Sequence, residues 1–325
     1  MSPLSYDTNS FQPLFTLGIS CGLRPLEEFP KNLAMLAEAG FGYLYFSELF
    51  HGETREHVKA RGGFGVVRRA ISDAGLKINS SHFGPLYPGP NDTLAGLKDS
   101  HRRGLDTAAE LGLQSVTTHY LWPTGLDDPN FIRPEIFAAY ARNVIREGPA
   151  FFREVVRVLG GPEAFLPKNN EMYRWFCDEA AQRGVTVTIE TAMCHLTRTP
   201  AQIIGIIGEI GRPNLGICLD SGHSHIAGVD VAAAVREAGP HLVETHFHDN
   251  FGDLDLHRPV GLGTIHWPEV ILALREIGFP GPVTFEAGGV SAHSREEELR
   301  MYAGNWRELL HTTAHREARL DPHAG

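Results

Sequence analysis

Metal-ligating and acid–base side chains recur in this sequence where short β-branched or aromatic runs end. Four such runs, VTVTIE, LGICLD, LVETH and PVTFE, end in Glu190, Asp220, His246 and Glu286. Carboxylate oxygens together with an imidazole nitrogen suit Mn²⁺, Mg²⁺, Co²⁺ or Zn²⁺. If the fold brings these ends together, the three carboxylates repel one another unless a cation neutralises them. We therefore expect one divalent metal ion per chain, with Mn²⁺ as the first expectation.

Further histidines and one acidic residue stand at comparable positions. Two earlier runs end in His82 (NSSHFGP) and His119 (VTTHY), and the segments after later runs contain His223, Asp255 and His257. A single His of this kind is usually structural, but six successive runs ending in such types indicate one shared site. Trp267, in GLGTIHW, could supply an apolar wall for a ligand at this site, with core packing as the alternative.

The runs themselves predict an α/β protein with a (β/α)8 TIM barrel. They alternate with longer amphipathic stretches, a pattern typical of βα units and a parallel sheet. A closed barrel fits better than a doubly wound sheet because no GxGxxG follows the first strand. Active sites of such barrels lie at the carboxyl ends of the strands, so the residues above should converge. The predicted strands are Leu17–Cys21, Tyr43–Ser47, Lys77–His82, Ser115–His119, Thr186–Glu190, Gly216–Leu219, Leu242–His246 and Val283–Glu286.

We interpret residues 1–325 as one domain. The barrel spans residues 15–314, and a polar tail follows over 315–325. A long insertion, residues 122–184, separates the fourth and fifth predicted strands where a barrel needs only one helix. We expect it to form a lid, a partner surface or an extra surface helix. Its two predicted helical runs are Glu135–Leu159 and Lys168–Arg183.

Composition narrows the class of partner. The net charge of −10 argues against a DNA-binding protein, because such proteins neutralise phosphates with Lys and Arg. No apolar run is long enough for a membrane span, and Met1–Gln12 lacks the features of a signal peptide. The four Cys residues form no CxxC pair, which favours a reducing compartment. We therefore expect a cytoplasmic protein that binds neither nucleic acid nor membrane.

Three stretches resemble the xylose isomerase-like TIM-barrel superfamily. ICLDSGHSHIAGVD is similar to its D-x-G-H…G-x-D stretch, HFHDN follows the seventh strand, and GLGTIHW is similar to G-x-G-x-x-x-W. The superfamily contains sugar and sugar-phosphate isomerases and epimerases, keto-sugar dehydratases and lyases, and endonuclease IV-type repair enzymes. The resemblance implies that His223 contacts a substrate oxygen and that Glu190 and Glu286 carry protons. It implies four metal ligands, namely Glu190, Asp220, His246 and Glu286.

The reaction implied is proton transfer beside the carbonyl of a keto-sugar or related polyol. One Glu would remove the α-proton to give an enediolate, and the other would return a proton from the opposite face. This gives epimerisation or, at the adjacent carbon, isomerisation. The first alternative is a metal-dependent lyase or dehydratase in which His119 or His257 drives β-elimination from a keto-sugar, keto-inositol or keto-glycoside. The chain has Asp249-Asn250 where ketohexose epimerases have an Arg-containing G-E-x-N-R-like stretch, which keeps this alternative open.

An endonuclease IV-like AP endonuclease is the second alternative. Five residues match that group's additional ligands for a three-metal cluster: His82, His119, His223, Asp255 and His257. Against it stand the acidic charge, His248 in place of an Asn, and Ala287 in place of the Thr in a Glu-Thr-Pro ending. We therefore assign those five residues, with Trp267, to a small carbohydrate substrate. A homo-oligomer is possible, with the insertion and residues 294–312 as contact surfaces.

Overall fold

The structure is a computed structural model of the 325-residue chain. It describes residues 12, 14, 16–21, 26–46, 52–84, 86, 93–120, 162–192, 196–288 and 293–320.

Eight parallel strands form one sheet that closes into a barrel. They are β1 (Leu17–Cys21), β2 (Tyr43–Phe46), β3 (Lys77–His82), β4 (Ser115–Thr118), β5 (Thr186–Glu190), β6 (Leu215–Asp220), β7 (Leu242–His246) and β8 (Val283–Phe285). The strand order is β7-β6-β5-β4-β3-β2-β1-β8, and a parallel bridge between Phe247 and Phe285 joins its two ends. There the Phe247 amide donates to the Thr284 carbonyl at 2.9 Å. The predicted (β/α)8 barrel is confirmed.

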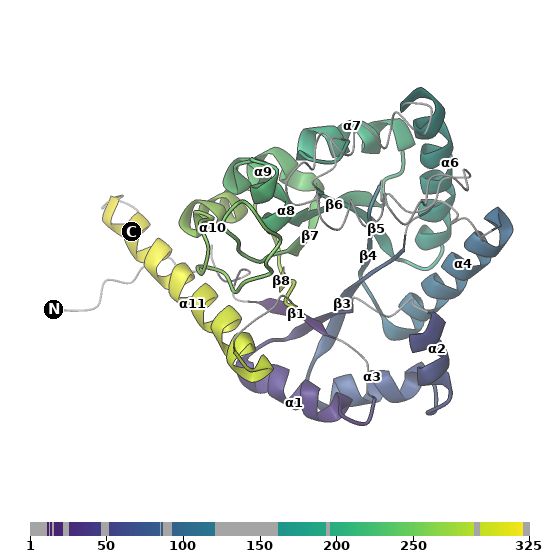
Figure 1. The fold of residues 1–325 in the computed structure, drawn as a ribbon, viewed down its shortest axis with the longest axis horizontal. Helices are drawn as coiled ribbons and strands as arrows, with labels where there is room; N and C mark the ends of the chain where they lie inside the picture. The colour runs from purple at the N-terminus through teal and green to yellow at the C-terminus, as the bar shows by residue number, and fades with distance from the viewer. Residues whose placement is uncertain are drawn as a thin grey trace.

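Helices surround the strands on the outside of the barrel (Figure 1). Glycines end several of them as the sequence predicts: Gly40 follows α1 with φ 91°, and Gly278 lies just beyond α10 with φ 66°. The helices are α1 (Phe29–Ala39), α2 (Gly52–Lys59), α3 (Phe64–Asp73), α4 (Leu94–Leu111), α6 (Pro162–Ala181), α7 (Pro200–Ile210), α8 (Ser221–Ile226), α9 (Val231–Ala238), α10 (Trp267–Glu276) and α11 (Arg295–Leu320), with a 3-10 turn at Gly239–His241.

Helix α6 shows that the inserted segment is shorter than the predicted residues 122–184. It packs against both α4 and α7, so it is the barrel helix that leads from β4 to β5. It begins at Pro162, earlier than the predicted run from Lys168. The surplus therefore lies before α6, in residues 121–161. The predicted helical run Glu135–Leu159 and a lid in this segment lie outside the described residues.

Helix α11 corrects the predicted polar tail. The helix continues to Leu320, past the His315 boundary that polar composition suggested. It is held to the barrel by Trp306, whose fully buried indole donates to the Leu14 carbonyl at 2.9 Å. Arg307 donates to the Gly40 carbonyl at the end of α1 at 3.0 Å. A helix that is anchored by one face can be polar on its outer face, and its polar composition then resembles that of an unstructured tail.

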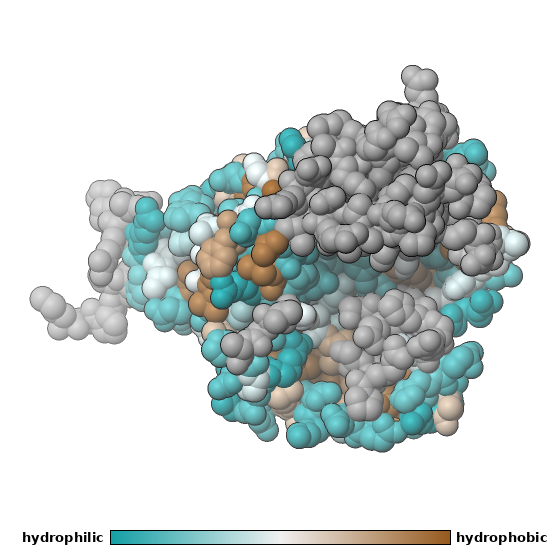
Figure 2. Space-filling model, in the orientation of Figure 1, coloured by the Kyte–Doolittle hydropathy of each residue, from teal (hydrophilic) through white to brown (hydrophobic). Residues whose placement is uncertain are grey.

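The described surface is mostly hydrophilic over the outer helices (Figure 2). Apolar side chains are exposed on the loop between β7 and α10, where Phe251, Leu254 and Leu262 are each at least 36% exposed. Within the described residues, no helix combines the length and apolar character that a membrane span requires.

A buried polar group lies inside the barrel below the carboxyl ends of the strands. The side chain of Glu244 on β7 is 1% exposed. It accepts hydrogen bonds from Asn79 Nδ2 at 2.5 Å and from Ser115 Oγ at 3.1 Å. Burial raises the pKa of the Glu244 carboxyl. Its hydrogen-bond donors are neutral, whereas Glu190 at the end of β5 lies among histidines.

Candidate metal and catalytic site

The carboxyl ends of β5 to β8 bring together the four residues expected as metal ligands. One ligand atom from each of Glu190, Asp220, His246 and Glu286 lies within 4.8 Å of all the others. Three of these residues are buried, and the Glu286 side chain is 21% exposed. Parallel pairing explains the convergence, since Glu190 lies opposite Cys218 and Asp220 lies opposite His246. Strand register thus places Asp220 level with His246, and it places Glu190 two residues lower, where the side chains of β6 point to the same face.

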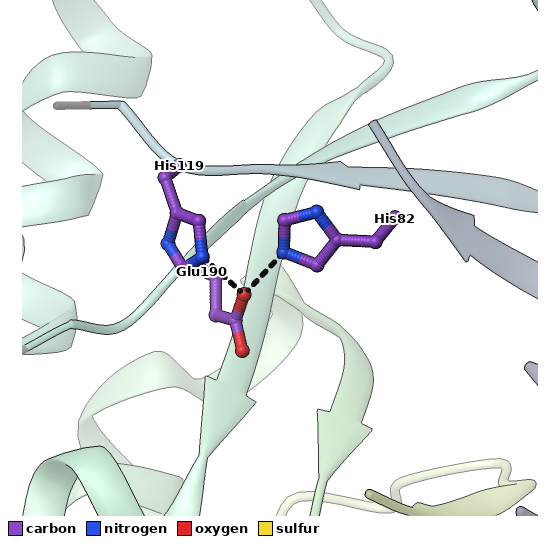
Figure 3. Close-up of side chains that lie close together, drawn as sticks. All are labelled: His82, His119 and Glu190. Atoms are coloured by element: carbon purple, nitrogen blue, oxygen red, sulfur yellow. Dashed lines mark hydrogen bonds and ion pairs between the residues drawn. The ribbon is translucent and has the colours of Figure 1, made fainter. Parts of the chain in front are cut away.

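Glu190 is the centre of this cluster. Its Oε1 lies 2.8 Å from His246 Nδ1, and its Oε2 lies 2.9 Å from His82 Nε2. His119 Nε2 lies 3.4 Å from the same Oε2. Figure 3 shows the His82 and His119 rings, from the ends of β3 and β4, turned toward one carboxylate oxygen. His246 Nδ1 also lies 3.4 Å from Glu286 Oε2 and so links the two carboxylates.

The surroundings of Glu190 keep it ionised. Burial alone raises the pKa of Glu190, but the charge of His246 and the hydrogen bonds from His246 and His82 lower it well below its usual value. Burial lowers the pKa of His119 to about 3, although Glu190 opposes this shift. The His119 ring is therefore neutral near pH 7, the form in which imidazole binds a metal.

Asp220 is held by its position at the start of α8. Its Oδ1 accepts from the His223 amide at 2.7 Å as the helix N-cap, and its Oδ2 lies 3.2 Å from His248 Nε2. Gly222 is required here, because a Cβ at this position would fall onto the His248 ring. The spacing in LDSGH therefore serves two purposes: it caps the helix and leaves room for a neighbouring histidine.

The predicted substrate residues on the β7–α10 loop form a second group. Asp255 Oδ2 lies 3.3 Å from both His223 Nε2 and His257 Nε2. His257 stacks on His248 with ring centroids 4.0 Å apart and an interplanar angle of 10°. His257 also adopts φ 44°, a left-handed conformation that is costly for a non-glycine residue. A strained residue in this cluster indicates that the loop is fixed by other contacts.

Asp249 supplies those contacts. It is fully buried, and its Oδ2 accepts from the Trp267 indole at 2.7 Å and the Gly261 amide at 3.0 Å. Its Oδ1 accepts from the amides of Asn250 at 2.9 Å and Ile265 at 3.3 Å. One carboxylate thus ties both ends of the loop that carries Asp255 and His257.

The position of Trp267 corrects its assignment as a substrate wall. Its side chain is 1% exposed and packs against Phe247 and Trp306, with ring centroids 5.4 and 5.9 Å away. The indole is therefore a core residue that orients the loop through Asp249. An aromatic residue after a glycine-rich turn has the same sequence signature in either role.

The donor atoms present fit divalent cations. Besides the four-residue group, His82, His119 and Glu190 form a second set of ligand atoms, and His248, Asp255 and His257 form a third. Sequence reasoning did not count His248 among the ligands. The alternation in HFHDN was a signal for it, because residues two apart on a strand point to the same side. Cys218, two residues before Asp220, likewise lies near Glu190 and His246.

Comparison with known proteins shows which proteins this chain resembles. Residues 161–309 match the xylose isomerase-like TIM barrel family. A ketose 3-epimerase from Arthrobacter globiformis is 30% identical over 136 residues, which cover 41% of this chain and 44% of that enzyme. The uncharacterized protein MJ1311 of Methanocaldococcus jannaschii is 25% identical over 203 residues, which cover 61% and 59% of the two chains. The resemblance that the motifs indicated is thus confirmed for residues 161–309, which match the xylose isomerase-like TIM barrel family.

The matches to solved structures extend over nearly the whole barrel. An L-ribulose 3-epimerase gives a TM-score of 0.65 at 19% identity, over 94% of this chain and 97% of that one. The probable 3-DHS dehydratase AsbF of Bacillus anthracis gives 0.62 at 15% identity, over 88% and 97%. The fold is therefore shared by an epimerase and a dehydratase. The matched segments of the two curated relatives span only about half of their lengths.

Proposed function

We propose that the protein is a divalent-metal-dependent epimerase or isomerase that acts on a keto-sugar or related polyol. The observation that carries this proposal is the convergence of Glu190, Asp220, His246 and Glu286 within 4.8 Å at the carboxyl ends of four adjacent strands. The named activity of the ketose 3-epimerase relative supports the same class of reaction. The substrate partner is a small carbohydrate, and Mn²⁺ is the metal we would test first.

The two glutamates would share the proton transfer. Glu286 is accessible, with a 21% exposed side chain, whereas Glu190 is 1% exposed and fixed by His82 and His246. One carboxylate accepts the proton from the carbon beside the carbonyl, and the other, protonated, returns one to the opposite face, so the substrate's proton count is unchanged. A bound divalent cation would supply the positive charge that stabilises the enediolate.

His223 and Asp255 are suited to hold the substrate in place. Their 3.3 Å contact lies next to Asp220, and both side chains are partly accessible, at 10% and 23%. Each can hydrogen-bond a sugar hydroxyl, His223 as a donor and Asp255 as an acceptor. His82 and His119, on the other side of Glu190, offer further imidazole nitrogens to the same space. Together with His257, these side chains would hold the substrate so that one particular carbon atom faces Glu190 and Glu286.

Solvent deuterium tests the shared enediolate step. The Mn²⁺-loaded protein is incubated in D2O with keto-sugars, keto-inositols and their glycosides, and incorporation beside the carbonyl is followed by NMR. We expect exchange with the wild-type protein and its loss in Glu190→Gln and Glu286→Gln. Glu171→Gln on the exposed side of α6 is the matched control and should retain exchange. Exchange that persists in both site variants would refute the proton roles. A product lacking water would identify the lyase alternative instead.

The structure also offers a specific observation for a second candidate, a phosphodiester hydrolase of the endonuclease IV type. Two sets of ligand atoms, the four-residue group and His82, His119 and Glu190, share Glu190. The third set, His248, Asp255 and His257, adjoins Asp220 through His248, so the three sets together could hold a three-metal cluster. The net charge of −10 opposes a duplex DNA substrate. Metal analysis after equilibration with Mn²⁺ or Zn²⁺ separates the two: one ion per chain supports the sugar enzyme. Three ions together with incision of abasic-site DNA at physiological salt would favour the hydrolase.

A further inference from the structure

A second cavity lies at the opposite end of the barrel from the metal-ligand cluster. It has a volume of about 630 Å³ and is lined by residues at the amino ends of β2, β3 and β4, by the last turns of α3 and α4, and by the segment before β8. Strand β3 connects the two ends: Lys77, its first residue, lines the cavity, and His82, its last, contacts Glu190. At about 3.3 Å per residue, the ends are roughly 16 Å apart.

The charge of this cavity is opposite to that of the rest of the molecule. Among the described residues, its lining includes two cationic side chains, Arg68 and Lys77, and no Asp or Glu. The whole chain, by contrast, carries a net charge of −10. A cleft lined by one sign of charge raises the local concentration of the opposite ion. The lining therefore favours a negatively charged ligand.

Both cationic groups are available to such a ligand. In the described part of the chain, neither forms an ion pair with a carboxylate. Lys77 Nζ lies 5.7 Å from the centroid of the Tyr43 ring, and Arg68 makes a long 3.5 Å hydrogen bond to the Glu110 carbonyl. A guanidinium has five N–H donors, so this contact leaves most of them unused.

The remaining lining suits an organic body attached to the charged group. Ile71, Leu111 and Pro282 provide apolar wall, and Gln114 and Tyr43 provide polar groups. The volume falls within the range of about 300–1,000 Å³ typical of small-molecule sites, which combine apolar walls with a few polar anchors. An inorganic ion alone would leave most of this wall uncovered.

We propose that this cavity binds a small organic anion, a phosphate or carboxylate on an apolar or ring-shaped body, independently of the catalytic end. The site would be separate from the substrate site, because the metal-ligand cluster lies at the other end of the strands. Arg68 and Lys77 contact the anionic group, and the apolar wall covers the body.

Titration calorimetry with phenyl phosphate and with benzoate tests this site on the full-length, metal-loaded protein. We expect binding of at least one of them, about tenfold weaker binding of neutral benzyl alcohol, and binding about five- to tenfold weaker in Arg68→Ala/Lys77→Ala. The control Arg69→Ala/Lys31→Ala removes the same charge from exposed positions outside the cavity and should bind as wild type.

The location of binding is checked separately. A chelator that strips the metal should leave the affinity unchanged if the anion binds at the amino-terminal end. The proposal is overturned if neither anion binds, if the control variant weakens binding equally, or if chelation abolishes it. The calorimetry measures anion binding alone and does not depend on deuterium exchange, so this proposal and the proposed function can fail independently.

Discussion

Glu190 and Glu244 are both glutamates with 1% exposure inside the same barrel, yet their surroundings shift their pKa values in opposite directions. The pKa of Glu190 is lowered because the nearby histidines outweigh its burial. The pKa of Glu244 is raised because burial dominates where its hydrogen-bond partners, Asn79 and Ser115, are neutral. Depth of burial therefore does not decide the state of a carboxylate. The chemistry at each end of the barrel depends on which partners the strands bring there.

The two ends of the barrel extend this contrast. Carboxylates and imidazoles meet at the carboxyl ends of the strands, whereas the described lining of the cavity at the amino ends contains Arg68 and Lys77 and no acid. A cation suits the first end and an anion the second. A strand of six residues separates them, so one scaffold can present both without mutual neutralisation.

The largest difference should appear between variants that replace one buried glutamate or the other, Glu190→Gln and Glu244→Gln. Because we propose Glu190 as a metal ligand and proton carrier, we expect Glu190→Gln to lower deuterium exchange by about 10²–10⁴-fold. Glu244→Gln keeps the shape of a group held by neutral donors and should retain exchange and Mn²⁺ binding near the wild-type level. NMR exchange rates and metal analysis provide the measurements. Equal losses in the two variants would mean that position in the barrel, not partner chemistry, decides function.

The next effect concerns the loop at the carboxyl-terminal end. Asp249→Asn replaces a carboxylate that accepts four hydrogen bonds by a group with a single oxygen, leaving buried donors unpaired. We expect a loss of about 2–4 kcal/mol in the free energy of unfolding. Asp253→Asn, an exposed position on the same loop, is the control and should change little. Urea denaturation measures both, and similar midpoints for the two variants would remove Asp249 as the anchor.

Much of this architecture could be predicted from the sequence. The limits of β1, β3, β5 and β7 agree with the prediction. In β5 the reason is clear, because the β-branched run TVTIE defines a strand sharply. Reading the last residue of each strand was enough to find Glu190, Asp220, His246 and Glu286, since parallel strands end on the same face. Their convergence is therefore a consequence of topology that one sequence can reveal.

Other features depend on contacts that no local pattern contains. His248 lies beside Asp220 only because β6 and β7 are neighbours. Trp267, on the next helix, donates a hydrogen bond to Asp249 and is a core residue. The cavity at the amino-terminal end is lined by segments from five separate parts of the chain. Packing between distant segments decides each of these.

Two glycine-to-alanine substitutions compare the packing of the loop anchored by Asp249 with that of the outer helices. A Cβ at Gly263 would fall onto Asn250 O and the Asp249 carboxylate, so Gly263→Ala should destabilise the fold by about 1–3 kcal/mol. Gly205 lies exposed in the middle of α7 with no atom near its missing Cβ, so Gly205→Ala should stabilise by about 0.5–1 kcal/mol. Thermal unfolding measures both. Shifts of the same sign would show that the loop is less tightly packed than its contacts indicate.

The smallest effect comes from a carboxylate in the helical layer, away from both ends of the barrel. Burial raises the pKa of Glu179 on α6, but hydrogen bonds from Arg102 and Arg183 lower it more, so it lies below the usual 4.5. A carboxylate with a lowered pKa in the folded state stabilises the protein above the unfolded pKa and loses this contribution as pH falls through the folded value. Glu179→Gln should therefore cost at most about 1 kcal/mol at pH 7, and less as the pH falls below 4.5. Urea titrations of both proteins from pH 7 to about pH 3 follow the difference. A gap that stays constant over this range would mean that packing of the side chain, and not its charge, joins α6 to α4.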